Sequence, residues 1–267
     1  MRPEFNISRR AALQRVGAGS LLALGLWPGT AKGQEGGKFR FVVVNDTHYI
    51  CEECGAWLGR VMERIRAAKP DFCLVAGDLT ELGKPEHLAA VHEVFRQAEV
   101  PVHVVIGNHD YASQTDRQGY ETTFPGQINY SFAHKGWQFV GLDTSEGMLA
   151  ENTRVQPATL EWLDRNLRKL DLSKPTVIFT HFPLGTNVKY RPVNADELLE
   201  RCRDFNLRAV FSGHFHGYTE RRKGETLLTT NVCCALKRGN HDNTTQKGYF
   251  LCDADGQTVR RRIVQVA

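Results

Sequence analysis

The chain has 267 residues, of which 41% are hydrophobic, enough for one large or two small globular domains. Its formal net charge is +4, and the basic excess lies before residue 34, where one acid, Glu4, accompanies Arg2, Arg9, Arg10, Arg15 and Lys32. The rest of the chain carries 29 basic and 29 acidic residues, and this neutral balance, without a basic stripe, argues against nucleic acid as a partner.

The N-terminus predicts export. Residues 8–14 resemble a twin-arginine signal, and the weakly hydrophobic stretch 16–27 is shorter than the roughly 20 apolar residues of a membrane span. We expect cleavage before Gln34, so residues 1–33 are a predicted signal peptide and the mature protein is periplasmic or extracellular. That pathway exports folded proteins, which suits uptake of a cofactor before export. An ordinary amphipathic helix and an uncleaved membrane tether remain alternatives.

Seven cysteines are present, and none of their spacings resembles a four-cysteine zinc site. Cys73 lies within a predicted strand, where cysteine acts as a small apolar residue. Cys51 and Cys54 form a Cys-x-x-Cys sequence that can form a disulfide in an oxidising compartment or stay reduced, and the sequence leaves both states open.

The first predicted strand covers residues 39–44, a nearly continuous apolar run typical of a strand buried on both faces. Asp46 and His48 follow its end. Residues two apart in an extended chain point to the same side, so a carboxylate and an imidazole are delivered together. That pair suits a divalent transition metal, although the motif is too short to be specific by itself.

Helices and strands then alternate, as expected of an α/β chain: helix 55–69, strand 71–76, helix 85–98 and strand 100–106. Gly77 permits a tight turn that leaves Asp78 projecting from the end of its strand. Asn108, His109 and Asp110 follow the next strand in the sequence Gly-Asn-His-Asp. The same four residue types recur at 239–242, but no strand precedes them, and we interpret that copy as a coincidence in a polar loop.

The second half begins with a predicted long loop at 111–126 and a hairpin with strands at 129–134 and 137–143. The later elements are helix 157–170, strand 176–180, a polar stretch at 185–193, helix 195–205 and strands 208–211, 218–222, 226–232, 249–253 and 258–265. His181 follows the strand 176–180, and His214 and His216 follow the strand 208–211. Residues 34–267 are therefore expected to form one domain.

Metal-capable side chains thus follow five separate strands, and five of the ten histidines lie at these positions. Packing alone explains such a distribution poorly. Parallel strands of one sheet bring their carboxyl ends to the same edge, so we expect these side chains to converge.

These blocks, in this order, resemble those of the calcineurin-like metallophosphoesterases: Asp46-Thr47-His48, Gly77-Asp78 through Gly83, Gly107-Asn108-His109-Asp110, Thr180-His181-Phe182-Pro183 and Gly213-His214-Phe215-His216. The resemblance covers roughly residues 39–217 and is greatest, in motif style, to class III cyclic-nucleotide phosphodiesterases. It implies an α/β fold, a four-layer αββα sandwich of two mixed β-sheets flanked by helices.

The resemblance also implies roles for the site residues. The first metal ion is expected on Asp46, His48 and His216, the second on Asn108, His181 and His214, and Asp78 bridges the two. His109 is the expected catalytic residue that is not a ligand: it stabilises phosphoryl oxygens or protonates the leaving alkoxide. Asp110 either orients that imidazole in catalysis or caps the following helix.

The mixed nitrogen and oxygen donors suit manganese, iron or zinc. Glu81 occupies the position of the tyrosine ligand of purple acid phosphatases, so an iron–tyrosinate site is not expected.

The implied activity is hydrolysis of a phosphate ester by hydroxide bound at a dinuclear metal centre, with a small phosphodiester as the expected substrate. A phosphomonoesterase or protein phosphatase of the same fold is the alternative, followed by a non-catalytic scaffold. Several residues could line a phosphate-binding rim, although we interpret them as solvated surface: Lys189, Tyr190, Arg191, Arg221 and Arg222. No membrane span is expected after signal cleavage, and nothing in the sequence predicts an oligomeric interface.

Overall fold

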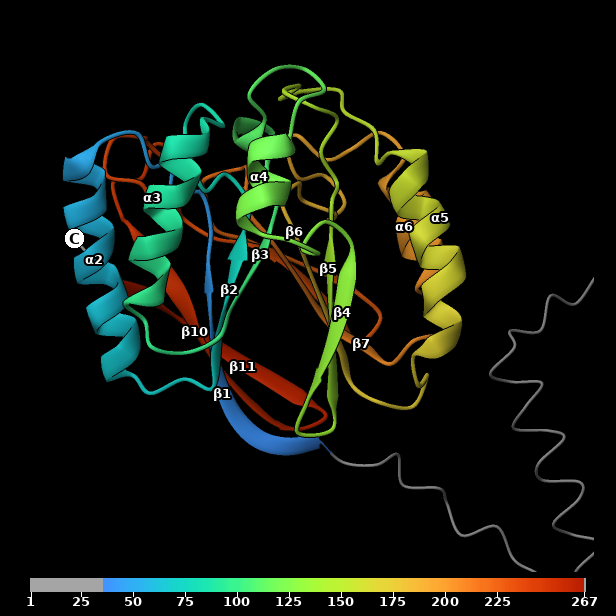
Figure 1. Cartoon of the computed structure of the whole chain (residues 1–267). Helices are drawn as coiled ribbons and strands as arrows, with labels where there is room; N and C mark the ends of the chain where they lie inside the picture. Colours follow the sequence, from blue (N-terminus) through green and yellow to red (C-terminus); the bar gives the residue numbers. More distant parts are fainter. Residues whose placement is uncertain (1–35, 267) are drawn as a thin grey trace, which may run out of the picture.

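The computed structural model describes residues 36–266, so the predicted export signal lies outside the described residues. Two β-sheets pack face to face, and helices cover the outer face of each (Figure 1). This confirms the four-layer α/β sandwich expected from the sequence. No helix in residues 36–266 is long and apolar enough to cross a membrane.

The first sheet has the strand order β11-β10-β1-β2-β3. Its strands are β1 (Gly36–Val44), β2 (Phe72–Ala76), β3 (Val102–Val105), β10 (Gly248–Gly256) and β11 (Thr258–Gln265). β1, β2 and β3 run parallel to one another, and β10 pairs antiparallel with β1. On its outer face lie the helices α2 (Glu52–Ala67), α3 (Pro85–Arg96) and α4 (Gln118–Thr123).

The second sheet has the strand order β4-β5-β6-β7-β9-β8. Its strands are β4 (Tyr130–His134), β5 (Trp137–Leu142), β6 (Thr176–Thr180), β7 (Leu207–Ser212), β8 (Thr219–Lys223) and β9 (Thr226–Thr230). β5, β6, β7 and β9 are parallel. The helices α5 (Pro157–Asn166) and α6 (Ala195–Arg201) cover its outer face, and two 3₁₀ turns, η1 (Asn108–Asp110) and η2 (Leu167–Lys169), complete the elements.

Aromatic side chains fill the space between the sheets. The rings of Phe41 and Phe72 in the first sheet stack at 5.4 Å, and Phe139 of the second sheet meets both edge-on. All three are almost completely buried. Burial of such rings is a large stabilising term, and edge-on contacts fix their relative orientation. This layer therefore holds the two sheets in a fixed alignment.

The predicted elements agree with the structure to within a few residues, with two exceptions. The loop predicted at 111–126 contains the short helix α4, whose Tyr120 is fully buried against the first sheet's helices. One buried residue gives no helical periodicity, so the sequence did not reveal it. The helix predicted at 195–205 ends at Arg201. No disulfide joins any of the seven cysteines, which all lie in the described residues, and the sulfur atoms of Cys51 and Cys54 are 3.8 Å apart.

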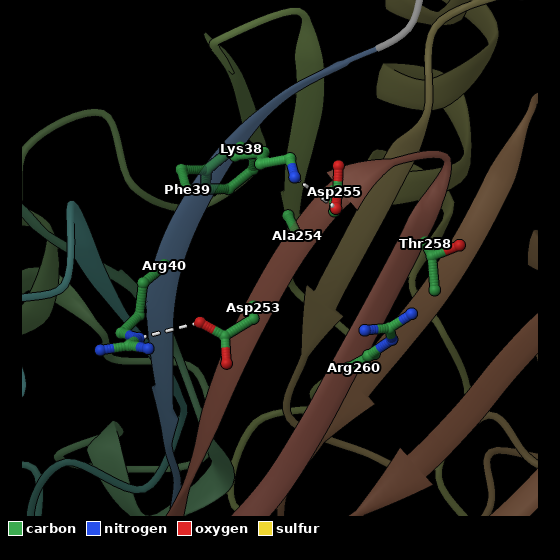
Figure 2. A pocket seen from close by; sticks show the side chains of 8 residues that line it. All are labelled: Lys38, Phe39, Arg40, Asp253, Ala254, Asp255, Thr258 and Arg260. Carbon is green, nitrogen blue, oxygen red and sulfur yellow. Dashed lines mark hydrogen bonds and ion pairs between the residues drawn. The ribbon is translucent and has the colours of Figure 1, made fainter.

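A surface hollow lies beside the amino-terminal end of β1 (Figure 2). Four of its charged side chains pair across β1 and β10: Lys38 with Asp255 at 3.2 Å and Arg40 with Asp253 at 2.9 Å. Because Asp46 follows the opposite end of β1, this hollow is separate from the predicted site.

Candidate metal centre

The predicted site residues converge where the parallel strands of both sheets end. Asp46 and His48 follow β1, Asp78 follows β2, and Asn108 and His109 follow β3, all in the first sheet. His181 follows β6, and His214 and His216 follow β7, in the second sheet. We expected the convergence at the edge of one sheet, and that part of the prediction was wrong: the site lies between two sheets, whose alignment is set by the aromatic layer.

Five of these residues have left-handed backbone conformations. Their φ angles are 53° for Asp46, 43° for His48, 50° for Asp78, 63° for His214 and 45° for His216. Such conformations cost non-glycine residues roughly 1–3 kcal/mol each and persist where surrounding contacts fix them. Those contacts are present: the backbone N–H of His48 donates to the carbonyl of Asp78 at 3.0 Å, and that of His214 donates to Oδ1 of Asp46 at 3.0 Å. The left-handed turns aim these side chains into one space.

Two glycines allow the strand ends to approach this closely. A Cβ atom on Gly107 would lie 2.2 Å from Oδ1 of Asp78. A Cβ atom on Gly77, which has a φ of 80°, would lie 2.5 Å from Nδ1 of His181. Both distances are far inside van der Waals contact, so a side chain at either position would displace a site residue.

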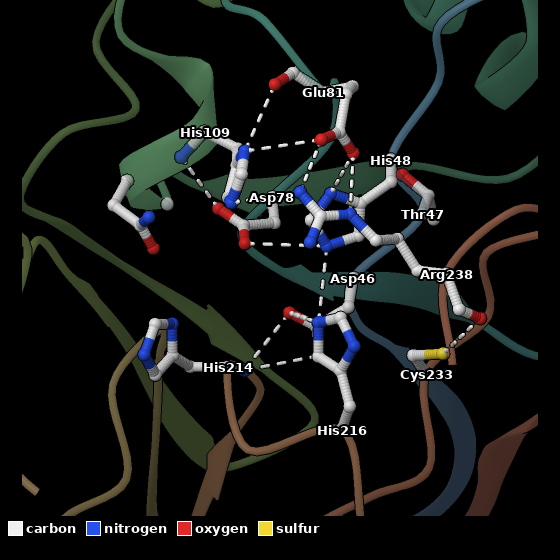
Figure 3. Close-up of polar contacts among 12 residues, drawn as sticks. Asp46, Thr47, His48, Asp78, Glu81, His109, His214, His216, Cys233 and Arg238 are labelled. Atoms are coloured by element: carbon white, nitrogen blue, oxygen red, sulfur yellow. Dashed lines mark hydrogen bonds and ion pairs between the residues drawn. The ribbon is translucent and has the colours of Figure 1, made fainter. Parts of the chain in front are cut away.

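The first cluster of possible ligands consists of Asp46, His48, Asp78 and His216, all buried and with donor atoms within 4.8 Å of one another (Figure 3). Nε2 of His48 lies 3.1 Å from Nε2 of His216 and 3.5 Å from Oδ2 of Asp78. Nε2 of His216 lies 3.4 Å from Oδ1 of Asp46. Two imidazoles and two carboxylates therefore face one point.

The second cluster consists of Asp78, His181 and His214, and it shares Asp78 with the first. Nε2 of His181 lies 3.2 Å from Nδ1 of His214 and 3.2 Å from Oδ1 of Asp78. The amide oxygen of Asn108 is also 3.2 Å from that nitrogen. One carboxylate thus contributes an oxygen to each cluster, as a bridging ligand must.

The outward ring nitrogens of the four histidines test whether the clusters suit metal ions. Each of these nitrogens lies near an oxygen acceptor. Three acceptors are backbone carbonyls: that of Ala76 lies 3.0 Å from Nδ1 of His181, that of Ala150 lies 2.9 Å from Nε2 of His214, and that of Gly239 lies 3.0 Å from Nδ1 of His216. The fourth is Oε2 of Glu81, which lies 3.0 Å from Nδ1 of His48. For His181, His214 and His216 this contact is a hydrogen bond, which keeps the proton on that nitrogen and turns the other lone pair inward, as in protein metal sites. For His48 it is an ion-pair distance without hydrogen-bond geometry. The donor set fits two transition-metal ions.

The carboxylates of the clusters are held in their charged form. Burial would raise the pKa of Asp78, but the imidazoles of His181 and His48 hold it well below its usual range. Burial likewise opposes ionisation of Asp46, and His216 and His181 outweigh it and lower the pKa. Both groups are therefore available as anionic ligands.

His109 lies at the edge of the clusters, with 29% of its side chain exposed. Its backbone N–H donates to Oδ1 of Asp78 at 2.9 Å. Its Nδ1 lies 3.0 Å from the backbone carbonyl of Glu81, so that nitrogen carries a proton, and its Nε2 lies 3.4 Å from Nη2 of Arg238.

The carboxylate of Asp110 contacts the backbone of two loops. Its buried carboxylate accepts hydrogen bonds from the backbone N–H groups of Leu79, Thr80 and Gly107 at 2.9–3.2 Å. Burial and the charge of Asp78 raise the pKa of Asp110 to about 7. The side chain therefore ties the loop after β2 to the loop after β3, which keeps Asp78 beside Asn108.

Sequence reasoning missed the loop between β9 and β10, residues 231–247, which lies against the site. Its Gly239 carbonyl meets His216, the ring of His241 stacks on that of His216 at 4.8 Å, and Arg238 pairs with Glu81. The second Gly-Asn-His-Asp sequence, at 239–242, therefore lies beside the site, contrary to its interpretation as a coincidence in a polar loop. The repetition of this tetrapeptide was the one signal in the sequence that pointed to the loop.

The residues considered for a phosphate-binding rim have protein partners. Arg191 pairs with Asp196 at 2.7 Å, and Arg221 donates to the carbonyls of Thr186 and Glu220. Tyr190 is different, because its ring meets that of His214 edge-on at 5.0 Å.

Comparisons with known proteins agree with this fold. Residues 39–218 match the sequence model of the family described as Calcineurin-like phosphoesterase. The chain is 28% identical over 206 residues to a probable cyclic nucleotide phosphodiesterase of Synechococcus sp., covering 72% of this chain and 77% of that protein. It is 27% identical over 182 residues to the glycerophosphodiester phosphodiesterase GpdQ of Enterobacter lignolyticus, covering 61% and 62% of the two chains. A dimetal phosphatase from Danio rerio has a similar fold, with a TM-score of 0.63 and 15% identity over 86% of this chain and 99% of that one.

Proposed function

Because the chain belongs to the calcineurin-like phosphoesterase family, we propose that it is a metal-dependent phosphoesterase that hydrolyses a small phosphodiester. The observation that carries this proposal is the shared carboxylate of Asp78, which lies within 3.5 Å of imidazole nitrogens in both clusters. A shared carboxylate places two cations side by side, the arrangement that phosphoryl transfer at two-metal sites requires.

Asp46, His48 and His216 would hold one ion, Asn108, His181 and His214 the other, and Asp78 both. When bound, two such ions supply Lewis-acid chemistry: they acidify a water molecule and offset the charge on phosphoryl oxygens. We propose manganese, iron or zinc, because the donors combine imidazole nitrogen with carboxylate and amide oxygen.

His109 acts on the substrate directly in this proposal. The Glu81 carbonyl fixes its ring through Nδ1, and 29% of the side chain is exposed at the edge of the clusters. In its doubly protonated form, with Nδ1–H held by that carbonyl, the imidazolium can donate a hydrogen bond from Nε2 to a phosphoryl oxygen or pass that proton to the leaving alkoxide. Asp110 contributes by holding the two loops that carry Asp78 and His109.

A diester is favoured over a monoester because the two relatives described above are named as phosphodiesterases. The formal charges after residue 34 balance, which suits a small anionic ester better than a nucleic acid. A substrate panel decides the class: 3′,5′-cyclic nucleotides, glycerophosphodiesters, nucleoside monophosphates and a phosphopeptide, each with Mn²⁺- or Zn²⁺-loaded protein. Metal-dependent hydrolysis of diesters supports the proposal, whereas hydrolysis of monoesters alone, or of nothing, contradicts it.

We also propose that residues 1–33 are a twin-arginine signal and that the enzyme acts outside the cytoplasm. The support is the sequence around Arg9 and Arg10. Replacement of both by lysine should keep the full-length protein in the cytoplasm, while the wild type is recovered outside it with Gln34 as its first residue. Export of the variant at the wild-type level would contradict this.

A further inference from the structure

Arg238 lies beside Glu81 and His109 (Figure 3). It makes a two-pronged ion pair with Glu81: Nε lies 2.9 Å from Oε2, and Nη2 contacts Oε1. Nη2 also lies 3.4 Å from Nε2 of His109. The side chain is 38% exposed, against 20% for Glu81, so the pair is only partly shielded from water.

The guanidinium group of Arg238 retains donors that the protein does not use. Nε and Nη2 face Glu81 and His109, whereas Nη1 has no hydrogen-bond partner within residues 36–266. A guanidinium group is always charged and planar, and its fork of N–H groups matches phosphate oxygens. Arg238 therefore presents unused charged donors beside His109.

Glu81 connects this arginine to the metal centre. Its Oε2 lies 3.0 Å from Nδ1 of His48, while Nε2 of the same ring faces His216 and Asp78. It is the one carboxylate within ion-pair distance of that Nδ1 in the described part of the chain. The negative charge of a carboxylate this close to the outer nitrogen of a histidine favours the proton on that nitrogen and leaves the inner nitrogen free to bind a metal ion. The same side chain thus contacts a predicted metal ligand and Arg238.

The neighbour of Arg238 anchors the loop from the other side. The carbonyl of Gly239 lies 3.0 Å from Nδ1 of His216, so the loop is joined to both a histidine of the centre and Glu81. Two attachments at consecutive residues define the position of the Arg238 side chain more closely than an exposed arginine on a free loop would allow.

We propose that Arg238 contacts the substrate, its guanidinium binding phosphoryl oxygens next to His109, and that Glu81 is the positioning residue that holds Arg238 and orients His48. This inference rests on the proposed function, because it concerns the same site. The competing explanation is that the ion pair only ties residues 231–247 to the loop after β2, and the two explanations differ in their effect on anion affinity.

The first test is binding of inorganic phosphate to the metal-loaded protein, measured by calorimetry and independent of turnover. Arg238→Met should weaken phosphate binding by about ten- to a hundredfold, the range expected for loss of a charged hydrogen bond, and lower kcat/KM for a diester similarly. Metal content and melting temperature should stay close to wild type. Arg238→Lys should recover part of the affinity, because it restores the charge without the fork.

Arg221→Met is the matched control, because it removes an exposed arginine of β8 whose partners are backbone carbonyls. It should leave phosphate affinity unchanged. Phosphate affinity within twofold of wild type in Arg238→Met would overturn the inference, as would a loss that merely follows reduced metal content. If the wild type binds phosphate through Arg238 but hydrolyses no diester, the proposed function fails while this inference stands.

Glu81→Gln tests the positioning role, since it keeps the shape of the side chain and removes its charge. Metal affinity, measured by competition with a chromophoric chelator, should fall by about ten- to a hundredfold. Phosphate affinity at saturating metal should fall as well, because Arg238 is no longer held. Unchanged metal affinity would contradict the link to His48.

Discussion

Nε2 of His48 lies 3.1 Å from Nε2 of His216, although the two residues are 168 positions apart and follow strands in different sheets. Two imidazole nitrogens at this distance repel each other unless a proton or a cation lies between their lone pairs. Asp46 and Asp78 add negative charge on either side. Cations bound between these groups would therefore stabilise the folded centre electrostatically.

Metal removal should destabilise the protein as well as inactivate it. A ligand that binds only the native state at 100 times its Kd adds about 2.7 kcal/mol to the free energy of unfolding. For a chain of this length, that corresponds to a decrease of roughly 5–10 °C in Tm on chelation. Scanning calorimetry before and after EDTA treatment, and after return of Mn²⁺, measures the effect. His87→Ala, on α3 outside both clusters, should behave as wild type, while Asp78→Asn should lose most of the metal-dependent shift. Equal melting temperatures with and without EDTA would be inconsistent with a bound pair of ions.

His109→Ala should separate catalysis from metal binding. Loss of a general acid lowers the rate by about 10²–10⁴-fold. His109 forms a third group of possible ligands with His48 and Glu81, but it is absent from the two clusters that share Asp78, so metal content should stay at the wild-type level. Single-turnover rates and metal analysis on one preparation measure both quantities. A rate within threefold of wild type, or a loss proportional to missing metal, would argue against this role.

Gly107→Ala should disturb the centre by steric contact alone. The φ of Gly107 is −110°, which alanine adopts without strain, but the added Cβ would lie 2.2 Å from Oδ1 and 2.3 Å from the backbone nitrogen of Asp78. The bridging carboxylate must then move, so we expect metal affinity to fall by at least about tenfold, in the range seen for loss of a ligand-orienting group.

Gly239→Ala is the control for this effect, because a Cβ there meets no atom within 4 Å and the carbonyl facing His216 is retained. Its metal affinity should match wild type. Metal affinities that do not differ between the two alanine variants would show that the crowding around Asp78 has no consequence.

The sequence was sufficient to predict which residues meet at the centre. Strands such as residues 176–180 are buried at every position, so they appear as unbroken apolar runs, and the polar residue after each run stands out. Chain order then identifies the carboxyl ends. The sheet to which a strand belongs was not predictable in this way, because the sequence of a strand buried on both faces does not show which strands lie beside it.

The contacts that hold the ligand side chains in place were also not predictable from the sequence, for two reasons. The carbonyls of Ala76, Ala150 and Gly239, which face the outward histidine nitrogens, are backbone atoms that any residue type supplies. Glu81 and Arg238 are 157 residues apart, and each resembles an ordinary charged residue of a polar loop, so the sequence did not indicate that they form an ion pair.

His103 should make the stability of the fold depend on pH. Its ring stacks on Phe132 at 3.8 Å, and burial, with a smaller contribution from nearby His134, lowers the pKa of His103 to about 4. In the unfolded chain the value is about 6.5. Between these values the unfolded state binds the extra proton, so this contribution to stability is complete above about pH 6.5 and is lost as the pH falls toward 4. Because the ring is partly exposed, we expect about 1–2 kcal/mol.

His103→Phe keeps the stacked ring and removes the titrating group. The free energy of unfolding in urea is measured at pH 7.5 and at pH 4.5 for both proteins. Between these pH values it should decrease less in His103→Phe than in wild type. The difference between the wild-type and variant decreases is the contribution of His103, separate from that of the acidic and histidine residues of the metal centre. His134→Gln should reduce the effect, because it removes the second imidazole that lowers the pKa of His103. Parallel pH dependences for wild type and His103→Phe would mean that the ring accepts its proton as readily in the folded protein as in the unfolded chain.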